Sequence, residues 1–377
     1  MIKVLIAGAF DIIHPGHLHF IKQAKIQGDF LTIIVARDQS ILKSKGRLPY
    51  YNENQRLGQL KKLKLADKVR LGNLGDHFEA VRQERPDIIC LGYDQTNFFT
   101  DKIKAENLKI EVKLLESFKS DIFQSRRLRK AFEDPQAGFL LVNKDSGWTS
   151  HDVVAKLRSI TKIRQIGHSG TLDPFATGLM VCGLGSATKM LGMTDILVKT
   201  YQAVVRLGAV SDTYDRTGEV KELKTEINIS LKQLKAVLDN FVGRQEQLPP
   251  MYSAKKVQGK KLYDLARQGK EVERKSSQIE IYGFDKVKAE DDLVNFEVKC
   301  SSGTYIRTLA NDLGQSLGTG ALLQELKRIQ IGNFKLKQAH KMSLLTKSNY
   351  RKYLISPEKV LQTLVSFARL NEIVGRG

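Results

Sequence analysis

One acidic side chain, Asp173, lies in the glycine-rich segment GHSGTLDPFATG at residues 167–178. The segment also holds one histidine, His168, five residues before the aspartate, but no second carboxylate and no cysteine. Paired-carboxylate glycosidase chemistry needs two acids, and metal-assisted hydrolysis needs several ligands. A single carboxylate is therefore left as a nucleophile or base on a substrate that contains its own leaving group. Taken alone, Leu-Asp-Pro is more typical of a turn aspartate that bonds to its own backbone.

A second group of chemically useful residues lies in GAFDIIHPGH, residues 8–17, directly after the first strand-like run. His14 and His17 stand one helical turn apart at the expected start of a helix, and Pro15 suits a first turn. The free N–H groups and partial positive charge of a helix N-terminus suit a polyphosphate. The alternative is that His14 caps the helix and His17 packs beneath it. The position after the first strand favours the phosphate site.

The elements that must position these histidines alternate between strand-like and helix-like runs over residues 1–134. In chain order the runs are IKVLIAG, HLHFIKQAK, FLTIIVA, NENQRLGQLKKLK, KVRLG, HFEAVRQER, DIICLG and IEVKLL. Short apolar runs separated by amphipathic helices predict an α/β doubly wound parallel sheet of the Rossmann-like type, covered on both faces. Such sheets bind ligands at the carboxyl ends of their strands.

The alternating pattern breaks at residues 133–138, where we place a linker. Beyond it, Tyr201, Ala203, Val205 and Leu207 alternate with polar residues, and so do Val294, Phe296, Val298 and Cys300. This alternation is typical of an antiparallel sheet with one buried face. Helices are expected near residues 149–161, 230–240 and 304–317, which makes the second domain α+β with a mixed, largely antiparallel sheet. SPEKVLQTLVSFA predicts a further helix near the C-terminus.

The composition indicates a soluble, basic protein. The net charge of +20 favours a polyanionic partner, because each phosphate neutralised by Lys or Arg releases condensed counterions. The three cysteines are far apart and form no CxxC pair, so we expect free, buried thiols and no zinc site. No apolar run is long enough to span a bilayer, and MIKVLIAGAF lacks the features of a secretory signal. We therefore expect a cytoplasmic protein.

HPGH, together with ARDQSILKSKGRLP, the helix with Asn54-Gln55-Arg56-Leu57, and LGYDQ, resembles the HxGH signature of the cytidylyltransferase-like nucleotidyltransferases. The resemblance covers residues 1–134 and is greatest to glycerol-phosphate cytidylyltransferases and archaeal-type FAD synthetases. It implies in-line attack of a phosphate monoester on the α-phosphorus of an NTP, with Mg²⁺ and release of pyrophosphate. The usual GTFD is GAFD here, and the later SSTxIR-like element is reduced to IFQSRRLR.

The resemblance also implies roles for residues of the first domain. His14 and His17 would stabilise charge on the α-phosphoryl oxygens, and Lys45 or Arg47 would hold phosphate. The positions that match the nucleotide site are Gly8, Ala9, Phe10, His14, Gly16, His17, Lys45, Arg47, Asp94, Ser125 and Arg129.

GHSGTLDPFATG resembles the GHxGTLDPxATG motif of the tRNA pseudouridine-55 synthases, the TruB family. The match continues over residues 138–345 through LLVNKDSGWTSHDVV, KTYQAVVRLGAVSDTYDRTGE, LPPMYSAKKVQGKKLYDLARQG and SSGTYIRTLANDLGQSLGTGALLQELKRIQIG. It implies the pseudouridine synthase fold and isomerisation of a T-loop uridine in tRNA, with no cofactor and no metal. Asp173 would be the catalytic carboxylate, through either a covalent adduct or a glycal-like intermediate.

Other roles follow from the same resemblance. Tyr201 would stack on the flipped uracil and manage the C5 proton. Tyr305 and Arg307, two apart on an extended segment, would point the same way, and Arg307 would pair with Asp173 to keep it ionised. Lys189 and Arg328 would contact phosphate or help shape the pocket, and Leu326 would pack against the base. The other expected RNA contacts are His168, which would fill the space of the flipped nucleotide, and the basic Lys255, Lys256, Lys260 and Lys261.

Residues 346–377 form a short C-terminal segment that is truncated relative to the PUA-like domain of many family members. We hypothesise that the basic first domain replaces some of the missing phosphate contacts to tRNA. Two alternatives remain. The chain could be an RNA-binding or tRNA-folding factor with dispensable catalysis, or nucleotidyl transfer could be its main activity. No membrane and no obligate protein partner is expected in any of these cases.

Overall fold

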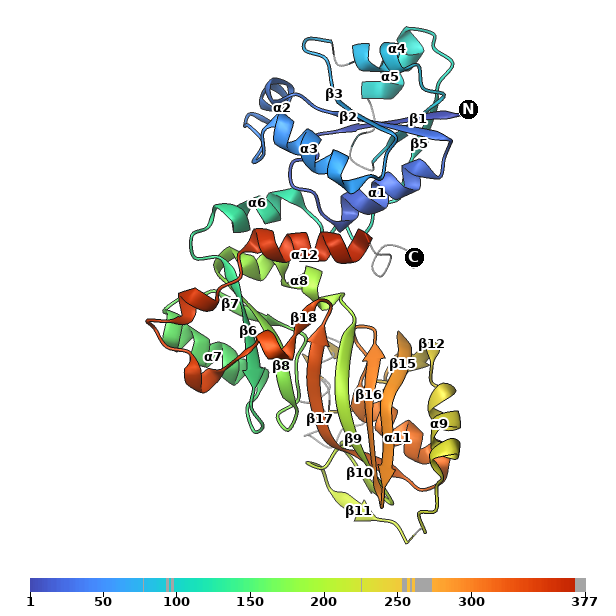
Figure 1. Ribbon diagram of the computed structural model, residues 1–377, viewed down its shortest axis with the longest axis vertical. Coiled ribbons are helices and arrows are strands. Elements are labelled where there is room, and N and C mark those ends of the chain that lie inside the picture. Colours follow the sequence, from blue (N-terminus) through green and yellow to red (C-terminus); the bar gives the residue numbers. More distant parts are fainter. Residues whose placement is uncertain are drawn as a thin grey trace. The chain divides into compact units, whose positions relative to one another are not determined.

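The computed structural model describes residues 1–76, 78–92, 95, 98–224, 226–252, 256–257, 260–261 and 273–369. The chain forms two compact units (Figure 1). Unit 1 consists of Met1–Ala137 and Ser356–Gly377, and unit 2 of Gly138–Ile355. The first change of unit falls within the expected linker, whereas the second divides the segment 346–377 between the two units.

Unit 1 contains a parallel sheet with the strand order β3-β2-β1-β4-β5. The strands are β1 (Lys3–Gly8), β2 (Phe30–Val35), β3 (Lys68–Leu71), β4 (Ile88–Leu91) and β5 (Glu111–Leu114). The helices are α1 (Pro15–Lys25), α2 (Asp38–Lys45), α3 (Glu53–Leu63), α4 (Glu79–Glu84), α5 (Phe98–Ala105), α6 (Ser125–Glu133) and α12 (Pro357–Arg369). The predicted doubly wound parallel sheet is confirmed.

Both faces of this sheet are covered, as the apolar strands require. Val4 and Ile6 of β1 belong to one core cluster, which also takes residues from α1, α3 and α12. Leu5, between them, belongs to a second cluster with residues of α4 and α5. Alternate side chains of β1 are therefore buried on opposite faces, which explains why the strands read as continuous hydrophobic runs.

Unit 2 is built on a mixed sheet with the order β12-β15-β16-β9-β17-β8-β6-β19, to which β7 and β18 also pair. Its pairs are antiparallel except β17 with β8 and β19 with β6. The strands are β6 (Gly138–Lys144), β7 (Ile166–Ser169), β8 (Thr177–Leu184), β9 (Lys199–Leu207), β12 (Gly243–Gln247), β15 (Ser277–Glu290), β16 (Leu293–Cys300), β17 (Ala321–Ile331), β18 (Phe334–Lys335) and β19 (His340–Lys341).

Two small hairpins pair outside this sheet, β10 (Ala209–Ser211) with β11 (Val220–Glu222), and β13 (Lys256–Val257) with β14 (Lys260–Lys261). The helices are α7 (Ser150–Thr161), α8 (Leu191–Asp195), α9 (Leu231–Asp239) and α11 (Ile306–Leu317). Short 3₁₀ helices cover Gly185–Met190, Leu336–Gln338, Met342–Leu344 and Tyr350–Tyr353.

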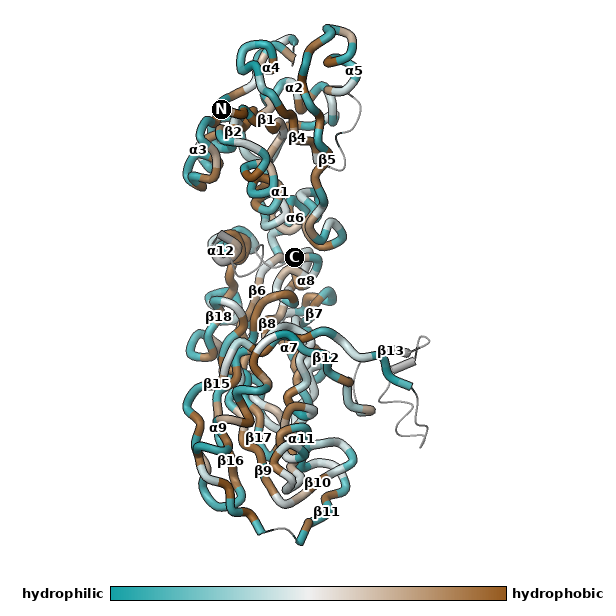
Figure 2. The backbone as a smooth tube through the Cα atoms, turned by 90° about the vertical axis from the view of Figure 1, so that its right-hand side faces the viewer, coloured by the Kyte–Doolittle hydropathy of each residue, from teal (hydrophilic) through white to brown (hydrophobic). Residues whose placement is uncertain are grey.

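The alternation predicted for β9 and β16 is confirmed. Tyr201, Ala203 and Val205 are buried and lie opposite Val298, Phe296 and Val294 in the antiparallel register. The expected helices at 149–161, 230–240 and 304–317 are present as α7, α9 and α11. In Figure 2 hydrophobic stretches follow β8 and β9, in keeping with strands whose inner face forms the core.

The chain enters and leaves unit 2 at one backbone bridge. The Phe139 N–H donates to the Ile355 carbonyl at 2.8 Å, and the Ile355 N–H donates to the Phe139 carbonyl at 2.9 Å. The first strand of the unit is therefore bonded to its last residue.

Cys90, Cys182 and Cys300 are free and buried, as expected. Among the described residues, none of the helices combines the length and the apolar composition needed to cross a bilayer.

Candidate functional site

Asp173 lies in the loop between β7 and β8, and the backbone of this loop is tightly constrained. Gly178, at the start of β8, has φ +104°, which side-chain-bearing residues rarely adopt. A Cβ atom at Gly178 would lie 2.3 Å from the Arg328 carbonyl oxygen of the neighbouring β17. The last glycine of the motif is therefore needed for the close approach of two strands.

Buried side chains hold the loop on both sides of the aspartate. The Ser150 hydroxyl bonds to both the carbonyl and the N–H of Leu172, at 3.1 and 2.9 Å. The Lys144 ammonium donates to the Pro174 carbonyl at 3.1 Å and to the Trp148 carbonyl at 2.6 Å. Both neighbours of Asp173 are thus fixed, so the carboxylate has a defined position.

Arg328 holds the two ends of the same loop. Its Nε donates to the Leu179 carbonyl at 2.7 Å and its Nη2 to the Gly170 carbonyl at 2.8 Å. The side chain is buried, with a residue exposure of 1%. Of the two roles expected for Arg328, phosphate contact and shaping of the pocket, this geometry fits the second.

Asp173 forms an ion pair with Arg307, the first-turn arginine of α11. Arg307 Nη2 donates to Asp173 Oδ1 at 3.1 Å, and Nε lies 3.0 Å from Oδ2. The arginine side chain is 5% exposed and the aspartate side chain 34% exposed. The guanidinium is further held by the carbonyls of Thr213, at 3.1 Å, and Tyr252, at 2.8 Å. The exposed partner of the pair is the carboxylate, which leaves it accessible to a substrate.

A second carboxylate, Asp215, lies on the other side of Arg307, with its Oδ2 3.5 Å from Arg307 Nη1. Asp215 is buried and accepts hydrogen bonds from the Thr217 N–H and hydroxyl and from the Thr213 hydroxyl. Asp215 was not among the expected site residues, because it lies 42 positions after Asp173 and outside the glycine-rich segment. The signal that could have found it is the flanking of Asp215 by threonines two residues away on each side, in TYDRT.

These contacts shift the pKa values in the site. Burial raises the pKa of Asp173 above the usual carboxyl range, and the charge of Asp215 adds to the rise, while Arg307 and Lys144 oppose it. Burial lowers the pKa of Lys144 to about 8. The ion pair with Arg307 therefore works against the tendency of this partly buried carboxyl group to take up a proton.

Tyr201 and Leu326 lie on the adjacent strands β9 and β17. Tyr201 of β9 is paired with Arg328 in the register, and Leu326 of β17 is paired with Ala203. Both side chains are buried, and burial raises the pKa of Tyr201, on which Arg328 and the Asp173 charge also act. Tyr201 is therefore within electrostatic reach of the aspartate.

The extended segment expected for Tyr305 and Arg307 is wrong, because α11 begins at Ile306. Tyr305 is the residue before the helix, and its backbone N–H and carbonyl bond to the side-chain amide of Gln247 at 2.7 and 3.0 Å. Arg307 reaches Asp173 from the first helical turn. The segment SSGTYIRT has no period that could have located this boundary.

The residues expected to contact RNA differ in how exposed they are. His168 on β7 is half-buried, with its ring centroid 5.8 Å from that of His151, and burial lowers its pKa. Lys189 is exposed. Lys255 lies outside the described residues, and for Lys256, Lys260 and Lys261 only the backbone of the β13–β14 hairpin is described.

Unit 1 contains a cavity of about 420 Å³ at the carboxyl ends of its strands. Its lining includes Gly8, Ala9, Phe10, His14, Gly16, His17, Lys45, Arg47, Ser125 and Arg129, ten of the eleven positions matched to a nucleotide site. Asp94, the eleventh, lies outside the described residues. Residues separated by more than a hundred positions thus surround one space.

His14 and His17 stack at the wall of this cavity, with ring centroids 3.9 Å apart. Burial lowers the pKa of His14 well below its usual value, and burial and the Lys45 charge lower the pKa of His17 to about 4. Both rings are therefore neutral near pH 7. Within the described part of the chain, Nδ1 of each ring is buried without a hydrogen-bond partner. A neutral imidazole can still donate one N–H to a phosphate oxygen.

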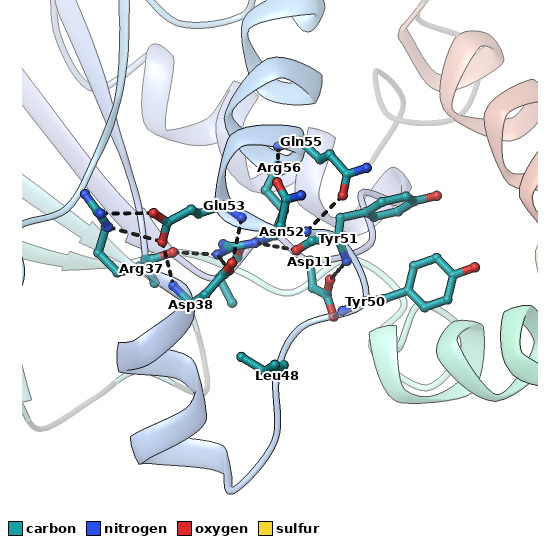
Figure 3. A network of polar contacts seen from close by, with 12 residues as sticks. Asp11, Arg37, Asp38, Leu48, Tyr50, Tyr51, Asn52, Glu53, Gln55 and Arg56 are labelled. Atoms are coloured by element: carbon teal, nitrogen blue, oxygen red, sulfur yellow. Dashed lines mark hydrogen bonds and ion pairs between the residues drawn. The ribbon is translucent and has the colours of Figure 1, made fainter.

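Arg56 of α3 connects the loops that frame the cavity (Figure 3). It is fully buried and donates to the carbonyls of Ala9, Ala36 and Tyr51, at 2.5, 2.7 and 3.0 Å. Its Nη2 also lies 2.6 Å from Asp38 Oδ1. The loops after β1 and β2 and the segment before α3 are therefore fixed to one guanidinium, a role that the motif alone did not indicate.

The segment Leu48–Tyr51 is fixed by two further contacts. Asp11 accepts the N–H groups of Tyr50 and Tyr51, at 2.9 and 3.0 Å, and Arg129 donates to the Leu48 carbonyl at 2.7 Å. Arg129 Nε also donates to Glu133 at 2.6 Å. Lys45 and Arg47, by contrast, are exposed at the cavity. They are therefore better placed than Arg129 to meet a phosphate.

Comparison with known proteins assigns both units to families. Residues 158–306 match the TruB family pseudouridylate synthase (N terminal domain), and residues 307–366 match the tRNA pseudouridylate synthase B C-terminal domain. Residues 5–137 match the cytidylyltransferase-like family. The molecule is thus a pseudouridine synthase, an isomerase, joined to a cytidylyltransferase-like domain.

Curated relatives define the family. The tRNA pseudouridine synthase B of Clostridium novyi is 44% identical over 225 residues, which cover 59% of this chain and 77% of the relative. That of Thermosipho melanesiensis is 43% identical over 224 residues, 59% of this chain and 73% of the relative. A solved Cbf5-Nop10-Gar1 complex matches with 25% identity and a TM-score of 0.49, covering 63% of this chain and 64% of that one. The chain belongs to the tRNA pseudouridine synthase B family.

Proposed function

We propose that unit 2 converts uridine 55 in the T-loop of tRNA to pseudouridine, with Asp173 as the catalytic carboxylate. The observation that carries the proposal is the half-exposed Asp173 carboxylate, paired with the buried Arg307 and held on a loop whose neighbouring residues are fixed. In the reaction the N1–C1′ bond breaks, the uracil turns and a C5–C1′ bond forms. A proton leaves C5 and N1 gains one, so no atom enters or leaves and no co-substrate is required.

The surrounding residues divide the remaining tasks. Arg307 stabilises the ionised form of Asp173, which is the form that can act at the ribose or the base. Tyr201 stacks on the uracil and manages the C5 proton, while Leu326 packs against the base. Either a covalent adduct at C1′ or a glycal-like intermediate satisfies this arrangement.

The target uridine must be flipped out of the base stack to reach Asp173. Extruding a nucleotide costs a few kcal/mol and costs least in a loop. His168, half-buried on β7, fills the space that the base leaves. Lys189 and the β13–β14 hairpin contact the phosphate backbone. A tRNA substrate also fits the cytoplasmic location expected from the sequence.

Asp173→Asn tests this function. Pseudouridine formation in a tRNA transcript, measured by tritium release from C5-labelled uridine, should fall by at least about a thousandfold because the variant lacks a nucleophile or base. Binding of the same tRNA should stay within about twofold, since the amide keeps the size of the side chain. Retained turnover would refute the catalytic assignment. The exposed Asp239→Asn is a matched control.

We further propose that unit 1 binds a nucleoside triphosphate. The supporting observation is the convergence of the HPGH residues, Lys45, Arg47 and Ser125 on one cavity. Neutral His14 and His17 would donate N–H groups to the α-phosphate, and the exposed cations would meet the outer phosphates. Mg²⁺ fits such a site when the phosphates and water supply most ligands, because the described residues form no cluster of three metal-ligating side chains.

The reaction expected in unit 1 is attack of a phosphate monoester on the α-phosphorus, with release of pyrophosphate. Incubation of the full chain with CTP or ATP, Mg²⁺ and a panel of phosphate monoesters tests it through pyrophosphate release. His17→Ala should lower the rate by about a hundredfold while pseudouridine formation stays unchanged. The absence of both nucleotide binding and pyrophosphate release across the panel would favour a domain that only supports RNA binding.

A further inference from the structure

The histidine proposed to replace the flipped nucleotide lies on a strand with little backbone support of its own. β7 is four residues long and, in the part of the chain that the structure describes, pairs with β8 alone. The strand ends at Ser169, and the next residue, Gly170, has φ +65°. The His168 ring is half-buried, and among the described residues its Nδ1 is buried without a hydrogen-bond partner. The position of the ring therefore depends on how its backbone is held.

That backbone is held by the residue that follows it. Ser169 is fully buried, and its hydroxyl donates to Asp195 Oδ1 at 2.7 Å. Asp195 is the last residue of α8, which packs against β7 (Figure 1). A hydroxyl that donates to a carboxylate forms one of the stronger hydrogen bonds in proteins, and a buried hydroxyl without an acceptor keeps the full cost of its desolvation. This bond therefore ties the end of β7 to α8.

The backbone of Asp195 is held as well. Its carbonyl accepts the ammonium of Lys199, whose side chain is buried at the start of β9. Lys199 lies two residues before Tyr201 on this strand, so both side chains are on the same face of the sheet. A Cβ atom at Gly170 would lie 3.9 Å from Lys199 Cε. Asp195 thus connects the segment that carries His168 with the strand that carries Tyr201.

The charge of Asp195 also acts on the imidazole. Burial and the charges of His151 and Arg328 lower the pKa of His168, and the Asp195 carboxylate opposes them. The carboxylate is therefore near His168 as well as bonded to Ser169, in agreement with the hydrogen bond one residue away.

We propose that Asp195 is a positioning residue for His168, and that it acts by binding the Ser169 hydroxyl. It fixes the end of β7 before tRNA binds, so less conformational entropy is lost when the imidazole fills the space of the extruded nucleotide. The inference rests on the role proposed above for His168, but the position of the imidazole is measurable without RNA. Asp195 takes no part in the bond changes at the uridine.

The experiment uses the full chain with Asp195→Ala, Asp195→Asn, Ser169→Ala, His168→Ala and the combination of Asp195→Ala with His168→Ala. Asp239→Ala, at an exposed acid on α9, is the matched control. The chain contains seven histidines, so NMR of isotope-labelled imidazole rings can follow His168, which is assigned by its loss in His168→Ala. A fluorescent purine beside the target uridine of a tRNA T-arm reports base extrusion. Single-turnover pseudouridine formation and thermal unfolding are measured in the same preparations.

Asp195→Ala and Ser169→Ala should each displace or broaden the His168 signal of the free protein and leave the signals of the unit 1 histidines unchanged. Each should slow base extrusion and single-turnover pseudouridine formation by about tenfold, the size expected for one hydrogen bond to a charged group. Asp195→Asn keeps an acceptor oxygen and should recover most of the rate. Asp195→Ala should add nothing in the His168→Ala background, because both changes remove the same contribution.

A wild-type His168 signal in Asp195→Ala would overturn the inference, and so would rate effects that add in the combined variant. Changes in all histidine signals together with earlier thermal unfolding would also overturn it, in favour of a general contribution to stability. If His168→Ala leaves base extrusion unchanged while Asp195→Ala still displaces the imidazole signal, the proposed role of His168 toward RNA fails and the positioning of its ring by Asp195 stands.

Discussion

At the scale of residues, both sites depend on buried cations that organise acceptors around them. Arg307 lies between two carboxylates, of which Asp215 is buried and hydrogen-bonded and Asp173 is half-exposed. Burial separates their roles, because the group that a substrate can reach is Asp173. Lys144 and Arg328 bind carbonyls of the loop that carries Asp173, so they fix the position of this carboxylate.

Asp215→Asn should shift the pH dependence of pseudouridine formation. The proposed mechanism needs Asp173 in its ionised form, so the rate of pseudouridine formation should fall as pH falls through the raised pKa of this residue. The charge of Asp215 contributes to that rise, and the amide keeps an acceptor for Thr217 while removing the charge. The acid limb of the pH profile should therefore move to lower pH. The profile is measured by tritium release, with Asp239→Asn as the control, and an unmoved or raised acid limb would contradict the assignment.

The residues that the sequence could identify were those within continuous motifs, such as Asp173 and the histidines of HPGH. Asp215 and Lys144 also lie in family segments, but their contacts to the Asp173 site span 42 and 29 or more positions. Neither spacing nor periodicity predicts which distant carboxylate or ammonium will fold against a loop. Such partners are set by backbone pairing, here by the pairing of Lys144 with Gly178 between β6 and β8 and by the bridge between Asp215 and Leu323 of β17.

At the scale of elements, the framework of each unit was predictable because its periods are clear. The pattern predicts a buried strand for each of the continuous apolar runs β1, β2 and β4. It predicts a half-buried strand for the alternating β9 and β16. The helix α11 was expected to begin near residue 304 and begins at Ile306, but SSGTYIRT has no period that separates the residues before the helix from its first turn. The conformation of the loops after β1 and β2 could not be predicted from the pattern either, because Arg56 fixes these loops through tertiary hydrogen bonds.

Arg56→Met should destabilise unit 1 by about 3 kcal/mol, because it leaves buried carbonyls and Asp38 without their donor. Arg37, whose ion pair with Glu53 is partly exposed, offers a matched control, and Arg37→Met should cost about 1 kcal/mol or less. Denaturant unfolding followed by hydrogen exchange of unit 1 amides measures both. Equal losses of unfolding free energy in the two variants would show that the Arg56 network contributes no more to stability than a partly exposed ion pair.

At the scale of the whole molecule, the positive charge is spread over both units, and unit 1 includes α12, which follows unit 2 in the sequence. The sequence indicated the change near residue 137 through its altered pattern. It did not indicate the second change at residue 355, because α12 is amphipathic and such a helix fits any apolar surface of suitable shape. Only the burial of its apolar face against α1 assigns it to unit 1.

The fragment 138–355 should retain pseudouridine formation but bind tRNA more weakly than the full chain. Its loss of cationic residues should reduce the dependence of affinity on salt, since fewer counterions are released. Filter binding between about 50 and 200 mM salt measures the slope. An unchanged affinity and slope would show that unit 1 makes no phosphate contacts. The fragment must lack residues 356–377 as well as 1–137, because α12 would otherwise expose its apolar face.

The bridge between Phe139 and Ile355 bears on how the two units are connected along the chain. Because the chain enters and leaves unit 2 at adjacent positions, unit 2 stands in the sequence between the two parts of unit 1. The first part is the cytidylyltransferase-like domain, and the second falls largely within the match to the synthase C-terminal domain. Insertions with neighbouring ends leave their host continuous. Excising residues 138–355 and joining 137 to 356 would regenerate unit 1 as one uninterrupted domain, whereas a single cut would leave one of its helices on the wrong fragment.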